Sequence, residues 1–274
     1  MQQQPLIFTC LLLVLEAADP CFQQTGVVFA DVEGTSFPVL CDSATDGGGW
    51  VVILERKDGS VDFGAPSWND YAHSQQGQLS GEFFLALDHL HLLTKDAQME
   101  LLVTMRKDSD SRWAYYDTFA VGAHSTKYRL TVSGYDAGSS AGNSFTYHSG
   151  MKWSAPDQDN DSWSSVNCAA IETAAWWHRA CTEVGLLKVF GQAIEWESFS
   201  VNLDTASMRI RPARCQTGPG LNCSQCKPGF FLCTSPISGR TSCCYQGISS
   251  CQEATTTGLW QLTSGEPVYC DAEL

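Results

Sequence analysis

The chain has 274 residues, of which 43% are hydrophobic, so it can bury the core of one large domain and a small one. Lysines and arginines number 16 and aspartates and glutamates 30, which leaves a formal net charge of −14. Recognition of a nucleic-acid backbone needs clustered positive charge, and the charge balance therefore argues against nucleic acid as a partner.

The N-terminal residues predict a signal peptide over residues 1–18. An apolar run, PLIFTCLLLVL, is closed by Glu16 and two alanines, and it is too short to cross a membrane as a helix. No Lys or Arg precedes the run, so a buried N-terminal segment is the alternative. Because no later apolar run reaches the length of a membrane helix, we expect a secreted chain without membrane insertion.

The segments that follow predict a mixture of strands and helix. Residues 81–94 carry apolar side chains at helical spacing and predict a helix that ends before Lys95. Residues 139–165 are rich in Gly, Ser, Asn and Asp and predict a long, irregular and functional loop region. A buried strand is expected over 49–56, a second strand over 99–107 from its length and its position before a turn, and a third over 128–135 from its alternation.

The distribution of cysteines predicts a domain boundary near residue 214. Of the 13 cysteines, Cys10 lies in the signal peptide, four lie in residues 19–214 and eight in residues 215–274. Without Cys10 the count is 13 − 1 = 12, an even number that suits an oxidised extracellular chain. We expect one globular domain over 19–214, and over 215–274 a small segment that needs disulfides because it has few apolar runs.

In residues 215–274, the sequence leaves open how the cysteines pair and whether Asn222 carries a glycan. Cys223 and Cys226 have the spacing of a zinc site, but the neighbouring cysteines and the secretory context favour disulfides, whose pairing the sequence does not decide. Asn222 begins a glycosylation sequon and is the candidate glycan site.

An acidic stretch, DQDNDSWSSVNC, places Asp157, Asp159 and Asp161 at alternate positions. This resembles the start of an EF-hand loop, but Ser162 stands where that loop needs glycine and Cys168 where it needs glutamate, so an EF-hand is excluded. Two interpretations of this stretch remain: a calcium site made of carboxylates and backbone carbonyls, or a solvated acidic turn.

Several segments in the same order resemble the fibrinogen-related domain of ficolins, tachylectins, angiopoietins and the fibrinogen chains. They are residues 41–94, 127–138, 147–163, the NCA, WW and Cys pattern of 167–181, and 199–212. The resemblance covers about residues 21–214 and implies a globular α+β domain with mixed or antiparallel sheets, short helices and a long irregular binding region. It also implies two disulfides, Cys21–Cys41 and Cys168–Cys181.

The resemblance implies one bound calcium ion. In the family pattern the ion takes the side chains that correspond to Asp159 and Asp161, together with backbone carbonyls that correspond to Trp163 and Ser165. Asp157 is then a flanking residue.

The resemblance further implies a ligand surface beside the second disulfide, with a cis peptide between Ala180 and Cys181. Two positions depart from the acetyl-binding members of the family: Glu172 replaces a tyrosine and Thr182 replaces a histidine. The ligand therefore remains open. The candidate ligand-binding residues are Glu172, Trp176, His178, Ala180, Cys181 and Thr182.

No pair of catalytic acid and base can be named, and the hydrolase-like GSSAG around Ser140 lies in a predicted loop, so we expect no enzyme. The leading hypothesis is a secreted, calcium-binding, lectin-like protein of innate-immune type that binds carbohydrate or acetylated groups. The alternative is an extracellular signalling or adhesion ligand that binds a cell-surface receptor. In either case a disulfide-linked or non-covalent homo-oligomer is possible.

Overall fold

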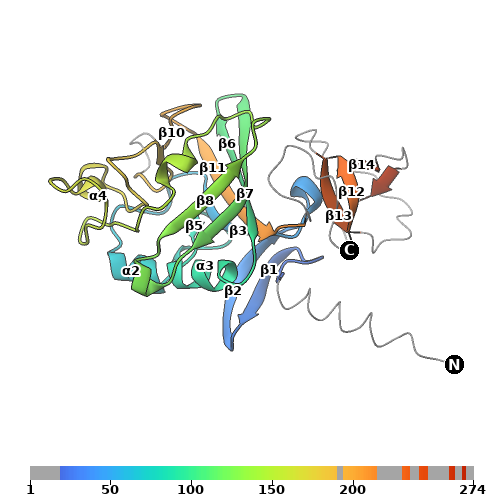
Figure 1. Ribbon diagram of the computed structural model, residues 1–274, viewed down its shortest axis with the longest axis horizontal. Helices are drawn as coiled ribbons and strands as arrows, with labels where there is room; N and C mark the ends of the chain where they lie inside the picture. The colour runs from blue at the N-terminus through green and yellow to red at the C-terminus, as the bar shows by residue number, and fades with distance from the viewer. Residues whose placement is uncertain are drawn as a thin grey trace. The chain divides into compact units, whose positions relative to one another are not determined.

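The computed structural model describes residues 19–189 and 194–214, together with the backbone of four strands within 215–274 (Figure 1). The chain divides into two compact units, one formed by residues 1–51 and 211–274 and the other by 52–210. The predicted signal peptide, the tail cysteines and Asn222 lie outside the described side chains. The predicted boundaries at residues 18 and 214 therefore stay predictions.

The first unit contains an antiparallel hairpin of β1 (Gly26–Val32) and β2 (Thr35–Asp42). Glu33 and Gly34 connect the strands with φ angles of 49° and 80°, the left-handed conformation that two-residue hairpin turns require. The sequence analysis did not predict this hairpin. The 3-10 turn η1 (Thr45–Gly47) follows it, and the predicted disulfide Cys21–Cys41 is present, with Cα atoms 5.2 Å apart.

The main strands of the second unit lie side by side in the order β3, β11, β6, β7, β8. Strands β3 and β11 have their ends, Trp50 and Pro212, in the first unit. Strand β3 also pairs with the short β5, which pairs with β4. The bounds of the strands are β3 (Trp50–Arg56), β4 (Gln76–Gly77), β5 (Phe83–Phe84), β6 (Met99–Lys107), β7 (Asp110–Val121), β8 (Leu130–Tyr135) and β11 (Thr205–Pro212).

The three predicted strands are confirmed as β3, β6 and β8, whereas the predicted helix over residues 81–94 is only partly correct. The helix α3 begins at Leu87 and ends at Thr94. Phe83 and Phe84, which lie within the predicted helix, instead pair with Glu55 and Leu54 of β3. Pairing with a buried strand satisfies their backbone groups and outweighs the local pattern.

The helices of the second unit are short. Helix α2 (Trp68–His73) begins with a reciprocal capping box between Ser67 and Asp70, and it lies beside α3 (Figure 1). Helix α4 (Cys168–Ile171) is capped by Asn167, whose side-chain oxygen accepts the N–H of Ala170. The remaining elements of this unit are η2 (His124–Thr126), η3 (Phe145–His148), β9 (Val184–Gly185) and β10 (Glu195–Trp196).

Backbone strands are also described in the C-terminal segment. They form a four-stranded sheet in the order β13, β12, β14, β15, in which each described pairing is antiparallel. Their bounds are β12 (Phe230–Thr234), β13 (Thr241–Tyr245), β14 (Leu259–Leu262) and β15 (Pro267–Tyr269). No helix of the described residues is long and apolar enough to cross a membrane.

A cluster of buried aromatic rings forms the core beneath the irregular region of the second unit. Trp153 stacks on Phe84 at 5.4 Å between ring centroids and meets Trp177 edge to face at 4.7 Å. Trp176 contacts both tryptophans and is fully buried. Such pairs add stabilisation beyond the area that they bury, and they hold the irregular segments in place without regular secondary structure.

A buried ion pair connects the sheet to the same region. The carboxylate of Glu82 accepts the Arg56 guanidinium at 3.4 Å and the backbone N–H of Lys57 at 2.7 Å. Arg56 also donates to the backbone carbonyls of Leu186 and Lys188. Because the carboxylate and two of the three guanidinium nitrogens are hydrogen-bonded, the pair can be buried.

Candidate functional site

The acidic loop, residues 157–168, is held at its start by a residue that was expected only to flank it. Asp157 Oδ1 accepts the backbone N–H of Trp68 at 2.9 Å, at the first residue of α2. Asn160 also faces inward, because its amide nitrogen donates to the Trp153 carbonyl at 2.9 Å. The side-chain nitrogen of Asn160 is therefore already engaged.

Asp159 and Asp161 curl the loop around their carboxylates. Asp159 Oδ1 accepts the N–H of Asp161 at 3.1 Å. Asp161 Oδ1 accepts the N–H of Trp163 at 2.7 Å, and its Oδ2 accepts the N–H of Cys168 at 2.8 Å. The two side chains thus take part in one turn, although the sequence placed them only at alternate positions.

The oxygens that the resemblance assigns to calcium form a hard donor set of the kind that this ion takes. In the described part of the chain the second oxygen of Asp159 has no hydrogen-bond partner, and the Trp163 carbonyl accepts one N–H, from Val166 at 3.1 Å. No cluster of three or more His, Cys, Asp or Glu side chains among the described residues could hold a metal ion. A cation here would therefore need backbone carbonyls, such as those of Trp163 and Ser165, besides the two carboxylates.

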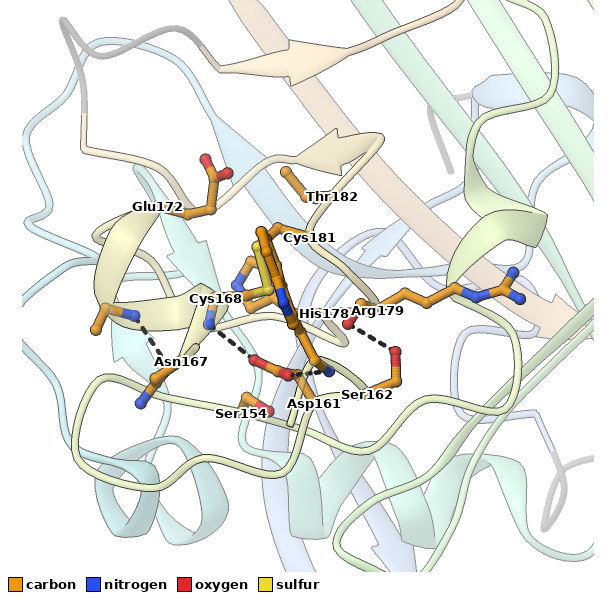
Figure 2. The surroundings of a disulfide bond; sticks show 12 residues. Ser154, Asp161, Ser162, Asn167, Cys168, Glu172, His178, Arg179, Cys181 and Thr182 are labelled. Carbon is orange, nitrogen blue, oxygen red and sulfur yellow. Dashed lines mark hydrogen bonds between the residues drawn. A yellow bond between two sulfur atoms is a disulfide. The ribbon is translucent and has the colours of Figure 1, made fainter. Parts of the chain in front are cut away.

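The predicted disulfide between Cys168 and Cys181 is present and joins the end of the acidic loop to the next segment (Figure 2). A second connection lies beside it, because Ser162 donates to the Arg179 carbonyl through its N–H at 3.1 Å and its hydroxyl at 2.7 Å. The peptide between Ala180 and Cys181 is cis, as the resemblance implied. The loop and residues 179–181 therefore form one covalently and non-covalently connected surface.

Three consecutive backbone donors lie free on this surface. Within the described residues, the N–H groups of Ala180, Cys181 and Thr182 make no hydrogen bond, whereas the Thr182 hydroxyl donates to the Val184 carbonyl at 2.6 Å. Ala180 is exposed, and Cys181 and Thr182 are half-buried. A row of such donors can accept a carbonyl or an anionic oxygen from a ligand.

The buried side chain of His148 bonds to the backbone that follows Thr182. The sequence analysis did not single out this residue. Its Nε2 accepts the N–H groups of Glu183 at 3.2 Å and Val184 at 3.1 Å, so its Nδ1 carries the proton and donates to the Trp177 carbonyl at 2.7 Å. Burial lowers the pKa of His148 to about 3, and the hydrogen bond to the Trp177 carbonyl opposes that shift only in part. The ring therefore remains neutral at physiological pH.

Glu172, which stands at the position of the acetyl-pocket tyrosine, is engaged in an ionic triad. Its carboxylate lies 2.6 Å from Lys188 Nζ, and the same ammonium lies 2.8 Å from Glu195. Burial alone would lower the pKa of Lys188, but hydrogen bonds and charge from the two glutamates raise it. Glu172 thus presents a neutralised carboxylate rather than a free one.

Trp176 and His178, the other two candidate ligand residues, lie beneath the surface with no exposed area. His178 Nε2 donates to the Ala174 carbonyl at 2.9 Å, which leaves Nδ1 as a buried acceptor without a partner among the described residues. Burial lowers the pKa of His178, so this ring too is held neutral. Both residues therefore shape the surface from inside.

Ser140 of the GSSAG segment has a structural role. Its hydroxyl oxygen accepts the backbone N–H of Trp113 at 3.0 Å, and the Ser139 hydroxyl accepts that of Tyr115 at the same distance. The segment is a turn after β8, and the next element is the short 3-10 helix η3 rather than an α-helix, so these residues do not form the strand, turn and α-helix of a nucleophile elbow. Its serines bond to the backbone of β7.

Sequence reasoning missed His148, Arg179 and Lys188. The contacts that give these residues their roles join segments far apart in the chain, for example His148 to Val184 and Arg56 to the Lys188 carbonyl. No local spacing marks such contacts. The capping box at Ser67 and Asp70, by contrast, has a local signature that could have located the start of α2.

Comparison with known proteins gives one family. The family described as fibrinogen beta and gamma chains, C-terminal globular domain, matches residues 22–213. Tenascin of Gallus gallus is 37% identical over 183 residues, which cover 64% of this chain and 10% of tenascin. Fibrinogen C domain-containing protein 1-B of Xenopus laevis is 38% identical over 211 residues, covering 70% of this chain and 45% of that protein. The chain thus spans less than half the length of these relatives.

Two solved structures share the fold. The fibrinogen-like globe domain of human ANGPTL2 superposes with a TM-score of 0.66 at 30% identity, covering 74% of this chain and 97% of that domain. Lamprey fibrin D-dimer, complexed with the peptide Gly-His-Arg-Pro-amide, superposes with a TM-score of 0.62 at 26% identity, covering 73% of each chain. These similarities confirm the expected α+β fold with antiparallel sheets and short helices.

Proposed function

Because the chain belongs to the family of fibrinogen C-terminal globular domains, we propose that it is a secreted recognition protein of lectin type that binds saccharides or acetylated groups. The observation that carries this proposal is the row of free N–H donors at Ala180, Cys181 and Thr182, beside the acidic loop. Binding sites combine a few such fixed polar groups with a shaped surface. The domain acts as a binding module rather than as a catalyst.

Calcium is part of this proposal. The carboxylates of Asp159 and Asp161 and the carbonyls of Trp163 and Ser165 would hold the ion. When bound, the ion neutralises the carboxylates and fixes the turn. The residues themselves support this role, because Asp161 already orders the loop through the N–H groups of Trp163 and Cys168. The ligand segment would then be positioned through the Cys168–Cys181 disulfide and through Ser162.

The test is retention on N-acetylated resin with calcium and with a chelator. We expect the wild-type chain to be retained with calcium and released by chelation. The variant Asp159→Asn should lose retention, because one carboxylate donor becomes an amide. The matched control Asp157→Asn carries the same charge change, yet its Oδ1 can still accept the N–H of Trp68. Retention that is equal with calcium and with chelator contradicts the proposal.

A second function is favoured by the pairing of Glu172 with Lys188. This ion pair occupies a position that the acetyl-binding members fill with an aromatic ring, and lamprey fibrin, a relative of the same fold, is complexed with a peptide. The alternative proposal is an extracellular ligand that docks a receptor protein through the same surface. Cell-surface binding that persists in saturating N-acetylated sugar supports the receptor function, and competition by the sugar supports the lectin function.

A further inference from the structure

We propose that strand β1 is a self-association edge, along which two copies of this chain pair in antiparallel fashion about a two-fold axis at Phe29. The proposal concerns the first unit and does not depend on the saccharide or the receptor function. Three features carry it: the free backbone groups of β1, its exposed apolar side chains, and a register in which the strand is complementary to itself.

The direction of the backbone groups of β1 follows from its pairing with β2 (Figure 1). Phe29 stands opposite Pro38, which has no N–H to donate, so the two form a non-hydrogen-bonded pair of the antiparallel ladder. The N–H and C=O of Phe29 therefore point away from β2, and by alternation so do those of Val27 and Asp31. Within the described residues these groups make no hydrogen bond, and no strand but β2 pairs with β1.

Strand β8, an outer strand of the sheet in the second unit, shows how an edge is covered in this protein. The Leu130 N–H donates to the Met151 carbonyl at 2.9 Å, and the Leu130 carbonyl accepts the N–H of Gly150 at 2.8 Å. Natural sheets otherwise protect an open edge with lysine, proline or a bulge. Residues 26–32 contain no Lys, Arg or Pro, and they pair with β2 without a register shift. The edge of β1 is thus open and unprotected.

The side chains on the outer face of β1 are apolar and exposed. Phe29 is 67% exposed, more than any other large hydrophobic side chain in the described part of the chain, and Val27 is 56% exposed. Their cross-strand neighbours on β2 are Pro38, which is exposed, and Leu40, which is half-buried. Because cross-strand neighbours share one face, the four side chains form an apolar strip, and such strips mark surfaces that bind another protein.

A second copy of β1 fits this edge best in the register centred on Phe29. Phe29 then pairs with Phe29 of the second copy and Val27 with Asp31, so all the outward N–H and C=O groups find partners. The two Asp31 residues lie four residues apart along the pair, about 13 Å, which exceeds the Debye length of about 8 Å. A register centred on Asp31 would instead place the two carboxylates opposite each other. The chain, with a net charge of −14, can therefore pair with itself along an uncharged centre.

The experiment measures the dimer dissociation constant of the full chain by sedimentation equilibrium without reductant. We expect a reversible dimer for the wild-type chain. Phe29→Thr keeps a residue that favours strands but removes the ring, and it should raise the dissociation constant by about tenfold or more. Asp31→Pro removes an outward N–H that the pairing with β2 does not use, and it should weaken the dimer to a similar extent while the hairpin persists.

Two matched pairs of variants control for side effects. Asp31→Asn removes the charge but keeps the outward N–H, so this variant should still form the dimer. Val27→Thr should weaken the dimer, whereas Val201→Thr, which changes a side chain that is also 56% exposed but lies outside β1, should leave it unchanged. Melting temperatures measured at low protein concentration will show that the variants fold.

Amide hydrogen exchange locates the contact. In the monomer the N–H groups of Val27, Phe29 and Asp31 should exchange freely, and in the wild-type dimer they should be protected. A dimer in which these amides stay unprotected overturns the edge pairing. A wild-type chain that remains monomeric at about 0.1 mM, where even a weak contact is populated, overturns it as well.

The remaining outcomes concern other modes of association. If Phe29→Thr and Asp31→Pro associate like wild type, β1 is not the interface. If the assembly dissociates only with reductant, the cysteines hold the copies together and the inference is wrong. None of these results changes the test on N-acetylated resin, so the self-association edge and the proposed function stand or fall separately.

Discussion

At the scale of single residues, the candidate site depends on side chains that are buried and neutral. His148 receives two backbone N–H groups on one ring nitrogen and donates from the other, so all its polar atoms are used only in the uncharged form. Protonation would place a third N–H against two existing donors. The hydrogen-bond geometry of His148 and its lowered pKa therefore agree, because both make a second proton on this buried ring unfavourable.

This arrangement predicts that acid destabilises the protein through His148. The pKa is about 3 in the folded chain and about 6.5 in the unfolded chain, so the unfolded chain binds the extra proton between these values. The free energy of unfolding should fall as the pH drops through that window, by up to about 1.4 kcal/mol per pH unit for this one group.

Urea unfolding between pH 4.5 and 7 measures the effect. The variant His148→Gln should be less stable than wild type at pH 7, because glutamine does not reproduce both bonding directions of the ring. Its stability should also depend less on pH, because one titrating group is gone. An identical slope in the two proteins would refute the assignment of the proton to His148.

At the scale of the elements, the acidic loop and the ligand segment are joined mainly by the Cys168–Cys181 disulfide, whose cysteines are 13 residues apart. Replacing both cysteines by alanine should cost about 3 kcal/mol of unfolding free energy, because closing a loop of this size restricts the unfolded chain. Binding to N-acetylated resin should fall as well, since the disulfide holds the acidic loop against residues 179–181.

The first disulfide provides the comparison for this prediction. Removing Cys21–Cys41, with a separation of 20, should lower stability by a similar amount but leave binding of the folded protein unchanged, because no candidate ligand residue depends on it. Denaturant titration and resin binding measure the two effects separately. Equal loss of binding in both double variants contradicts a specific role for the second disulfide.

The elements also show how far the sequence could be read. Strands β3 and β6 are buried on both faces and have continuous apolar runs. The run predicted β3 by itself, whereas β6 was predicted from its length and its position before a turn. Strand β7 interleaves polar and aromatic side chains and so has no continuous apolar run. Strand β1 does have an apolar run, GVVFADV, which the sequence analysis did not use, and its Val27 and Phe29 are exposed. The acidic loop was placed by resemblance, whereas the roles of Asp157 and Lys188 come from contacts with distant segments that no local pattern records.

At the scale of the whole molecule, calcium should act as a stabilising ligand. A ligand that binds only the folded state, at a concentration one hundred times its dissociation constant, adds about 2.7 kcal/mol to the free energy of unfolding. For a domain of this size, we expect the melting temperature to rise by about 5 to 10 °C. The variant Asp159→Asn should lose this rise and Asp157→Asn should keep it. A melting temperature indifferent to calcium in the wild-type chain rules out the ion.

The number of binding sites in one assembly decides how tightly the protein would bind a surface that carries many copies of its ligand. Individual saccharide sites gain apparent affinity when several are linked, and a disulfide-linked or non-covalent homo-oligomer remains our expectation for the full chain. Native mass measurement with and without reductant shows which kind of assembly exists. The cysteines of residues 215–274 are the candidates for links between chains.

The anchoring of the acidic loop at both ends has a consequence for how this protein can change. Asp157 is fixed to the start of α2, and Cys168 is fixed to Cys181. Side chains between them that hold neither the proposed ion nor Arg179 can therefore differ in type without moving either end. New specificities can thus arise by exchanging a short cassette on an unchanged scaffold. Random libraries confined to the side chains of residues 163–166 are a natural starting point for engineering this domain toward other ligands.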